Sequence, residues 1–292
     1  MSADDATVEP PTEDAVAAPS AARALAASLV DPLLDALVGL GDWTLFSLRA
    51  TSGVFTKHMK RSEFLRACVE IGVGSFGVVA VTGVFIGMVL AVQAYNQFHT
   101  IGLDTSLGAV IHMSIIRELG PVLAAVMLAG RVGTAMAAQL ATMRVTEQID
   151  ALACLGVDPV KFLVAPRFLA CVVMIPLLTV VADALGIVGS TFIALKVFQI
   201  DAFHYWRHTA NFVTLWDLFV GLFKSVDFGG VLSLICCHRG VNSRAGAEGV
   251  GRAATEGFVL SFVAVLVIDF VLGLLFNTLG NVFFPVVTSR IA

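Results

Sequence analysis

Five stretches of mainly apolar residues dominate this sequence, and each is long enough to cross a lipid bilayer. A spanning helix needs about 20 such residues, because the hydrocarbon core of a membrane is about 30 Å thick. The stretches cover residues 72–97, 107–143, 167–196, 213–236 and 257–285. With 58% hydrophobic and 14% charged residues, the chain has too little polar surface for a water-soluble fold. The sequence therefore predicts an all-α integral membrane protein with about five transmembrane helices.

The second stretch is too long for a simple crossing. It contains Gly120 followed by Pro121, and a proline removes one backbone hydrogen bond from a helix. We therefore expect this segment to be a broken or strongly tilted helix.

The N-terminal region differs in composition from the rest of the chain. Residues 1–28 are rich in alanine, proline and acidic side chains and predict a disordered cytoplasmic tail. Residues 29–66 contain leucines near helical spacing, interrupted by Asp31, Asp35 and Asp42, which predicts an amphipathic helix in the membrane interface. Residues 67–292 then form the transmembrane domain.

The distribution of lysine and arginine gives an orientation. These residues are concentrated before the first span and in the connections 144–166 and 237–256, whereas residues 98–106 contain none and residues 197–212 contain only Arg207. Cytoplasmic connections carry the excess of positive residues in membrane proteins. The N-terminus is therefore predicted to be cytoplasmic and, with five spans, the C-terminus lies on the opposite side.

Several ionisable residues fall inside the predicted spans, where each needs a partner charge, water or a protein environment. Arg117 and Glu118 are adjacent and point about 100° apart on a helix, so we expect both to find partners on other helices, with Lys224 as the cation available to Glu118. Taken singly, each of these charged residues could instead belong to a structural ion pair that holds the helices together, with no role in binding. For Arg117, Glu118 and Lys224 together we favour a polar cavity lining. The residues interpreted as structural charges are Arg131, Asp183, Asp217, Asp227 and Asp269.

Glycines are unusually dense in the first span, at Gly72, Gly74, Gly77, Gly83 and Gly87. Small residues let transmembrane helices approach closely. Tight packing explains each glycine singly, and their density suggests an interface such as one between two copies.

The connection between the second and third spans predicts a short helix with its own start and stop signals. Thr146 is a good N-cap, Glu147 places an acid at the positive helix end, Gly156 suits a left-handed C-terminal position, and Pro159 prevents continuation. Ile149, Leu152 and Leu155 would be available for docking. The residues assigned to this coupling helix are Thr146, Glu147, Gln148, Ile149, Asp150, Leu152, Leu155 and Gly156. Such a helix suits the transmission of force from a cytoplasmic ATPase, and an ordinary surface helix is the alternative.

The sequence contains no signature of catalysis. A phosphate-binding loop, a zinc-binding His-Glu-x-x-His pattern and a Gly-x-Ser-x-Gly elbow are all missing. We therefore predict no catalytic residues, no metal site and no cofactor in this chain, so that any ATP would be bound by a partner subunit. The net charge of −4 without a basic block also argues against a nucleic-acid partner.

Three runs of residues resemble the MlaE/YrbE permease family of MCE-type lipid transporters. They are Arg117 to Leu123, Ala129 to Gly133 and Thr142 to Leu152, and the similarity continues through Gly156 to Pro159, Lys224 and Ser225, and Gly246 to Gly251. The resemblance covers about residues 60–285, within the predicted domain 67–292.

The resemblance implies a homodimeric permease of the bacterial inner membrane. Such permeases associate with cytoplasmic ABC ATPases and a periplasmic hexamer of MCE-domain subunits, and they move phospholipid between the inner and outer membranes. Arg117, Glu118 and Lys224 match positions that line the lipid cavity, and residues 146–156 match the coupling helix. The C-terminus would then be periplasmic.

Two other functions are alternatives to lipid transport. An ion- or proton-coupled secondary transporter could use the intramembrane aspartates as a relay, but it should transport without an ATPase, and no inverted repeat is evident. An intramembrane enzyme is disfavoured because the sequence offers no recognisable set of nucleophile, base and metal ligands.

Overall fold

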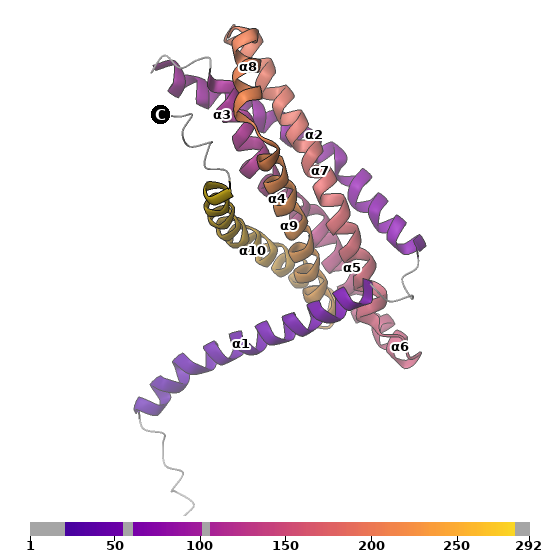
Figure 1. Cartoon of the computed structure of the whole chain (residues 1–292). Helices are drawn as coiled ribbons and strands as arrows, with labels where there is room; N and C mark the ends of the chain where they lie inside the picture. Colours follow the sequence, from indigo (N-terminus) through magenta and orange to yellow (C-terminus); the bar gives the residue numbers. More distant parts are fainter. Residues whose placement is uncertain (1–20, 55–60, 101–105, 284–292) are drawn as a thin grey trace, which may run out of the picture. The chain divides into compact units, whose positions relative to one another are not determined.

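The computed structural model describes residues 21–54, 61–100 and 106–283, and within these ranges the chain is helical without any strand (Figure 1). Five helical segments are long and apolar enough to cross a membrane: Arg61–Thr100, Leu107–Val145, Val160–Val197, Leu215–Val241 and Gly246–Gly280. The predicted all-α class with five candidate spanning helices is confirmed.

The helices follow one another with short connections. In chain order they are α1 (Ala21–Val54), α2 (Arg61–Thr100), α3 (Leu107–Ser114), α4 (Gly120–Leu128), α5 (Thr134–Val145), α6 (Gln148–Cys154), α7 (Ala165–Phe192), α8 (Ala202–Phe212), α9 (Leu215–Val241) and α10 (Gly246–Phe283). Wider π-helical turns occupy Ile115–Leu119, Ala129–Gly133, Val160–Val164 and Ile193–Val197. The first two turns make the second span, Leu107–Val145, one continuous helical segment, and the last two do the same for the third span, Val160–Val197.

Helix α1 begins at Ala21, inside the range 1–28 for which the sequence predicts a disordered tail, and residues 1–20 lie outside the described residues. Its leucines at Leu34, Leu37, Leu40 and Leu45 are exposed. From Phe46 onward the chain forms one compact unit. There, Phe46 and Ala50 are buried, and the Phe46 ring meets the His238 ring edge-on with centroids 5.1 Å apart.

Helices α2 and α7 pack with their backbones in close approach. Gly83 and Gly87 of α2 face the backbone of Ala182 and Gly186 on α7, where a side-chain carbon on either glycine would overlap a carbonyl oxygen. Backbone proximity of this kind is how small residues stabilise helix pairs in lipid, where dispersion forces replace the hydrophobic effect. These two glycines therefore serve packing within the chain, and an interface between two copies stays a prediction.

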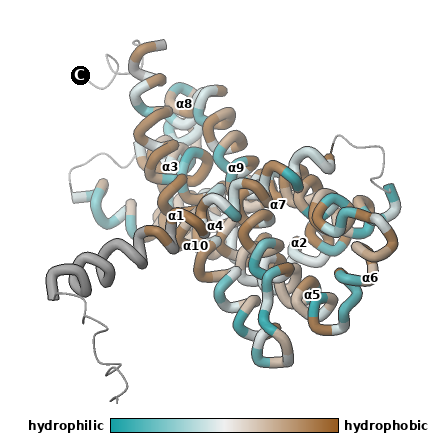
Figure 2. Tube along the Cα trace, turned by 90° about the horizontal axis from the view of Figure 1, so that it is seen from below, coloured by the Kyte–Doolittle hydropathy of each residue, from teal (hydrophilic) through white to brown (hydrophobic). Residues whose placement is uncertain are grey.

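Hydrophobic residues predominate along α4 and α10, whereas hydrophilic residues occur on α6 (Figure 2). Helix α10 exposes Val267, Phe270 and Val271 to more than half of their possible area. Large exposed apolar faces are expected of helices that contact lipid or other membrane subunits.

Candidate functional site

The second span carries Arg117 and Glu118 on a π-helical turn directly before Pro121. Gly120 donates its backbone N–H to the carbonyl oxygen of Ile115, five residues earlier. The wider turn places Pro121 in the first turn of α4, where a missing N–H costs little. Of the two predicted alternatives, a broken or a strongly tilted helix, the broken one is wrong, because a change of helix type accommodates the proline within a continuous helical segment from Leu107 to Val145. The strong tilt stays a prediction.

The same turn allows α9 to approach closely. Gly221 of α9 faces the carbonyl oxygen of Ile116, and a side-chain carbon at Gly221 would collide with that oxygen. Lys224 lies one helical turn further along α9, so this contact fixes the position of its side chain relative to the π-helical turn.

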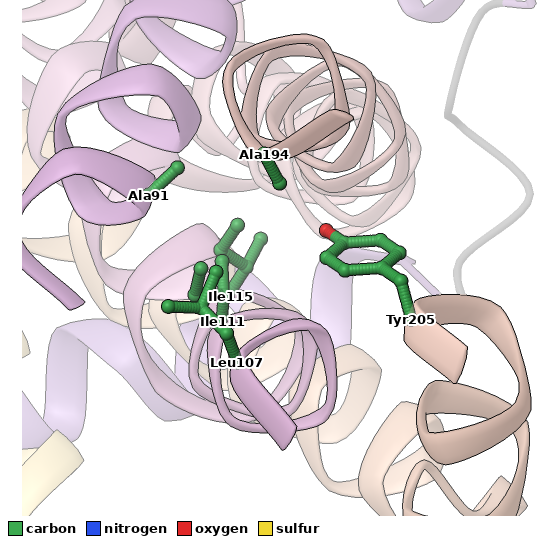
Figure 3. Close-up of a cluster of buried hydrophobic side chains, with 6 residues drawn as sticks. All are labelled: Ala91, Leu107, Ile111, Ile115, Ala194 and Tyr205. Carbon is green, nitrogen blue, oxygen red and sulfur yellow. The ribbon is translucent and has the colours of Figure 1, made fainter. Parts of the chain in front are cut away.

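A cluster of buried hydrophobic side chains packs around Ile115, the first residue of the π-helical turn. Ile115 belongs to it together with Leu107 and Ile111 of the same span, and Figure 3 shows these side chains directed toward α2 and the third span, with Tyr205 of α8 beside them. The Tyr205 hydroxyl lies 3.1 Å from Nε2 of the buried His112. Burial raises the pKa of Tyr205, so its hydroxyl keeps its proton at neutral pH.

Lys224 is the centre of the candidate site. Its side chain is completely buried, and its ammonium group contacts Glu118 Oε2 and, at 2.9 Å, Asp269 Oδ1 of α10. The predicted pairing of Glu118 with Lys224 is confirmed. A buried ammonium group needs such partners, because an uncompensated charge away from water is costly.

Arg117 extends the cluster toward the start of α9. Its guanidinium Nη1 lies 3.7 Å from Asp217 Oδ1, and its Nε lies 3.9 Å from Glu118 Oε1. Asp217 also accepts hydrogen bonds from the backbone N–H and the hydroxyl of Thr214, at 2.9 and 2.7 Å, and so caps α9. The sequence separated Asp217 and Asp269 from the cavity residues as structural charges, whereas the structure places them in the same cluster.

An open pocket of about 450 Å³ lies against this cluster. Arg117, Glu118 and Asp269 form its polar wall, and Phe270 and Leu274 belong to its apolar part. The side chains of Glu118 and Asp269 are 42% and 22% exposed, whereas Lys224 lies behind them with no exposed area. A molecule in the pocket would therefore meet two carboxylates and a guanidinium beside a hydrophobic surface.

The other intramembrane charges do not join this cluster. Arg131 Nη1 donates to Ser75 Oγ at 2.8 Å. Asp183 is buried beside Gly120, where a side-chain carbon on the glycine would overlap Asp183 Oδ1, and this oxygen has no hydrogen-bond partner among the described residues. Asp227 is half-buried and makes no ion pair in the described part of the chain. Asp183 and Asp227 therefore have no charged partner in the described part of the chain, and their role as structural charges stays a prediction.

Helix α6 has the predicted C-terminal stop. Gly156 adopts the left-handed conformation with φ of 75°, the N–H of Val157 bonds to the carbonyl of Leu152 at 3.1 Å, and the N–H of Gly156 bonds to that of Ala153 at 3.0 Å. These two bonds form a Schellman motif. Asp150, on the exposed side of the helix, pairs with Arg144 at 2.5 Å.

The start of α6 differs from the prediction. Thr146 ends α5, and its hydroxyl donates back to the carbonyl of Thr142 at 2.9 Å, so it does not cap α6. Glu147 occupies the N-cap position with a positive φ of 59°, which turns the chain between the two helices, and α6 begins at Gln148. Ile149 is buried, Leu152 is half-buried and Leu155 is 77% exposed, so Ile149 anchors the helix and is not available for docking.

Two features of the site were missed from the sequence. The buried contact between His112 and Tyr205 joins residues far apart in the chain, and no local pattern indicated it. The π-helical turn was signalled only indirectly, by a proline inside an otherwise helical span.

No group of three or more metal-ligating side chains occurs in the residues that the structure describes.

Comparison with known proteins gives this arrangement its context. The family described as permease MlaE matches residues 64–275. A probable ABC transporter permease protein of Rickettsia felis is 39% identical over 237 residues, covering 81% of this chain and 92% of the relative. A protein of the same description from Synechocystis sp. is 41% identical over 225 residues, covering 77% and 86%.

A plant protein is also similar. Protein trigalactosyldiacylglycerol 1, chloroplastic, of Arabidopsis thaliana is 37% identical over 212 residues, covering 73% of this chain and 61% of the relative. The family match extends over most of the chain and includes every member of the charged cluster as well as α6. The chain is therefore a multi-pass membrane protein that belongs to the MlaE family of ABC transporter permeases.

Proposed function

We propose that this chain is the permease subunit of an ABC transporter that moves phospholipids between the inner and outer membranes of a bacterium. The observation that carries the proposal is a pocket in which Glu118 and Asp269, held from behind by the buried Lys224, stand beside an apolar surface that includes Phe270 and Leu274. A phospholipid has the same two parts, because it joins a charged head group to hydrocarbon chains. In a site of low dielectric constant, a fixed head-group charge interacts strongly with such side chains.

The relatives support a lipid as cargo. The Arabidopsis relative is named after a galactolipid, and the resemblance to MCE-type transporters implies phospholipid. We propose that two copies of the chain form the permease, that a periplasmic hexamer of MCE-domain subunits receives the lipid, and that the N-terminus is cytoplasmic and the C-terminus periplasmic.

Helix α6 is the proposed contact with the ATPase. A permease of this class requires a separate ATP-hydrolysing partner, and α6 is a short helix anchored by Ile149 with Leu155 exposed at its end. A helix held rigidly between two spans can transmit a push to both of them. The absence of a phosphate loop from the sequence agrees with ATP hydrolysis on another polypeptide.

Photo-cross-linking tests the pocket as the lipid site. A benzophenone amino acid replaces Leu274, which lines the pocket, or Leu266, which lies two turns earlier on the exposed part of α10 as a matched control. Cells are grown with radioactive phosphate, irradiated, and examined for labelled lipid on the purified chain. We expect Glu118→Lys to lower the labelling at position 274 and to leave that at position 266 unchanged, because position 266 samples bulk lipid.

Transport is then measured with the assembled complex in proteoliposomes. We expect Glu118→Lys to impair ATP-dependent lipid transfer more than Glu118→Gln, because the lysine places a second cation against Lys224. Full transfer by Glu118→Lys would remove Glu118 from the lipid site. Transfer by the chain without an ATPase would instead favour the secondary transporter and contradict the proposal.

A further inference from the structure

A second polar pocket lies between the end of α9 and the beginning of α10, with a volume of about 200 Å³. Its polar lining consists of Arg239, Asn242, Ser243, Arg244, Arg252 and Glu256. Arg239 follows Lys224 by about 20 Å along α9 at 1.5 Å per residue, so this pocket is separate from the charged cluster described above.

The charges in the pocket are not balanced. Glu256 accepts from both Arg239 Nη1 at 3.3 Å and Arg252 Nε at 2.7 Å. Arg244 is exposed and makes no ion pair with any of the described residues. The lining thus contains three guanidinium groups and one carboxylate, and Glu248 in the first turn of α10, which interacts electrostatically with Arg252, lies outside the lining. The pocket therefore has an excess of positive charge.

Ser243 gives an independent sign of a missing partner. Ser243 lines the pocket, and its hydroxyl oxygen is buried and makes no hydrogen bond in the described part of the chain. A buried hydroxyl without a partner is unfavourable, and an anion in the pocket would accept a hydrogen bond from it. The loop that carries Ser243 is closely packed, since Gly249 lies buried against the backbone of Arg244.

The position of the pocket identifies the class of anion. Arg239 lies near the end of one spanning helix, and Arg252 lies near the start of the next. Helix ends of this kind lie at the level of lipid head groups, and basic pockets between spanning helices bind anionic head groups. Arginine is suited to this role because its planar guanidinium donates two parallel hydrogen bonds to phosphate oxygens.

We propose that this pocket binds the phosphate group of an anionic phospholipid from the leaflet at this end of the helices. The bound lipid would accept hydrogen bonds from Arg244, Arg252 and Ser243 and would hold the connection between α9 and α10. This site does not depend on the proposed function, because a bound lipid of this kind need not be the transported one.

Hydrogen exchange of the full chain in lipid nanodiscs tests the proposal. The nanodiscs contain phosphatidylcholine with increasing fractions of phosphatidylglycerol, and a parallel series contains phosphatidylcholine alone with added inorganic phosphate. We expect residues 242–249 to exchange more slowly as phosphatidylglycerol increases and to be unaffected by inorganic phosphate. Equal protection by inorganic phosphate would show a soluble-anion site and overturn the assignment to lipid.

Variants separate this site from general attraction of anionic lipid to a basic surface. Arg244→Gln should raise the half-saturating fraction of phosphatidylglycerol about tenfold, which corresponds to about 1.4 kcal/mol, because it removes a charge-assisted hydrogen bond to the phosphate. Arg244 makes no ion pair among the described residues, so this variant should fold normally. The control Arg61→Gln removes an exposed cation at the start of α2 and should leave the titration unchanged.

Two results would contradict the proposal. An equal effect of Arg61→Gln would indicate diffuse electrostatic attraction without a site. Protection of residues 242–249 that is insensitive to phosphatidylglycerol but appears when the ATPase is added would assign the pocket to a protein contact.

Discussion

At the scale of single residues, Lys224 has the most constrained environment in the charged cluster. It has no exposed area, and its ammonium group touches two carboxylates from two other spans. Removing one partner of a buried ion pair leaves the others uncompensated, which costs more than the pair contributes when it is intact. Lys224 therefore joins the second, fourth and fifth spans at one point.

We expect Lys224→Met to lower both stability and lipid transfer. The substitution leaves Glu118 and Asp269 facing each other, and we expect a loss of about 1–3 kcal/mol, below the full value for buried pairs because Glu118 is partly exposed. Thermal unfolding in detergent measures the loss. The double variant Lys224→Met with Asp269→Asn should recover part of it, and a double variant no more stable than the single one would contradict this account.

The sequence predicted this cluster only in part. Glu118 and Lys224 could be paired because each is an isolated opposite charge within an apolar span. Asp217 and Asp269 could not be assigned to the same site, since helical periodicity gives the angle of a residue on its own helix but not the helix beside it. The pairing of Arg117 with Asp217 could not be predicted for the same reason, because it requires knowing which helix lies beside the second span.

At the scale of helices, α6 depends on two residues in the left-handed conformation, Glu147 and Gly156. Only glycine adopts this conformation at little cost, and other residues lose roughly 1–2 kcal/mol there. We expect Gly156→Ala to loosen α6 and Glu147→Gly to leave it unchanged or more stable. Hydrogen exchange of residues 148–155 measures both effects. Faster exchange in Glu147→Gly than in Gly156→Ala would show that the backbone conformation does not control the stability of α6.

Helix α8 gives a prediction about pH. Hydrogen bonding with the His204 side chain, aided by the backbone N–H groups of Phe203 and His204, holds the pKa of Asp201 below its usual value. Because the folded pKa is depressed, the stabilisation is complete above the ordinary pKa of about 3.9 and is lost as pH falls through the folded pKa.

We therefore expect the first turn of α8 to exchange faster in Asp201→Ala than in the natural chain at pH 7. The difference should disappear as pH falls below about 3.9. Asp201→Asn is the matched control, since asparagine also caps helices well and should retain most of the protection at both pH values. A difference that persists at low pH would exclude the carboxylate as its source.

The helices themselves were predictable to different degrees. Spanning segments are defined by long apolar runs, so their number could be read from the sequence. The cap of α6 could not, because Thr146 has the side chain of an N-cap but a backbone that continues α5. Tertiary packing of Ile149 determines where the chain turns, and this packing leaves no local signal.

At the scale of the whole molecule, five crossings by the candidate spans would place α6 and α8 on opposite sides of the membrane. The native Cys154 of α6 is exposed, whereas Cys171, Cys236 and Cys237 are buried. We expect a membrane-impermeant maleimide to label Cys154 in inverted vesicles but not in spheroplasts, because the distribution of lysine and arginine predicts a cytoplasmic α6. His204→Cys on α8 should show the reverse pattern. Labelling of Cys154 from outside would invert the proposed orientation.

The two π-helical turns in the second span also affect how its surface must be mapped. Each inserts about one residue relative to a regular α-helix and so rotates everything after it by about 100°. A helical wheel drawn continuously from Leu107 to Val145 therefore misassigns the face of α5 by roughly 200°. Scanning mutagenesis of this span has to be phased separately for α3, α4 and α5. A single-residue deletion within Ile115–Leu119 would remove the inserted residue and leave Arg131 facing the same neighbours, whereas a deletion within α4 would rotate Arg131 by about 100° while leaving the hydropathy of the segment nearly unchanged.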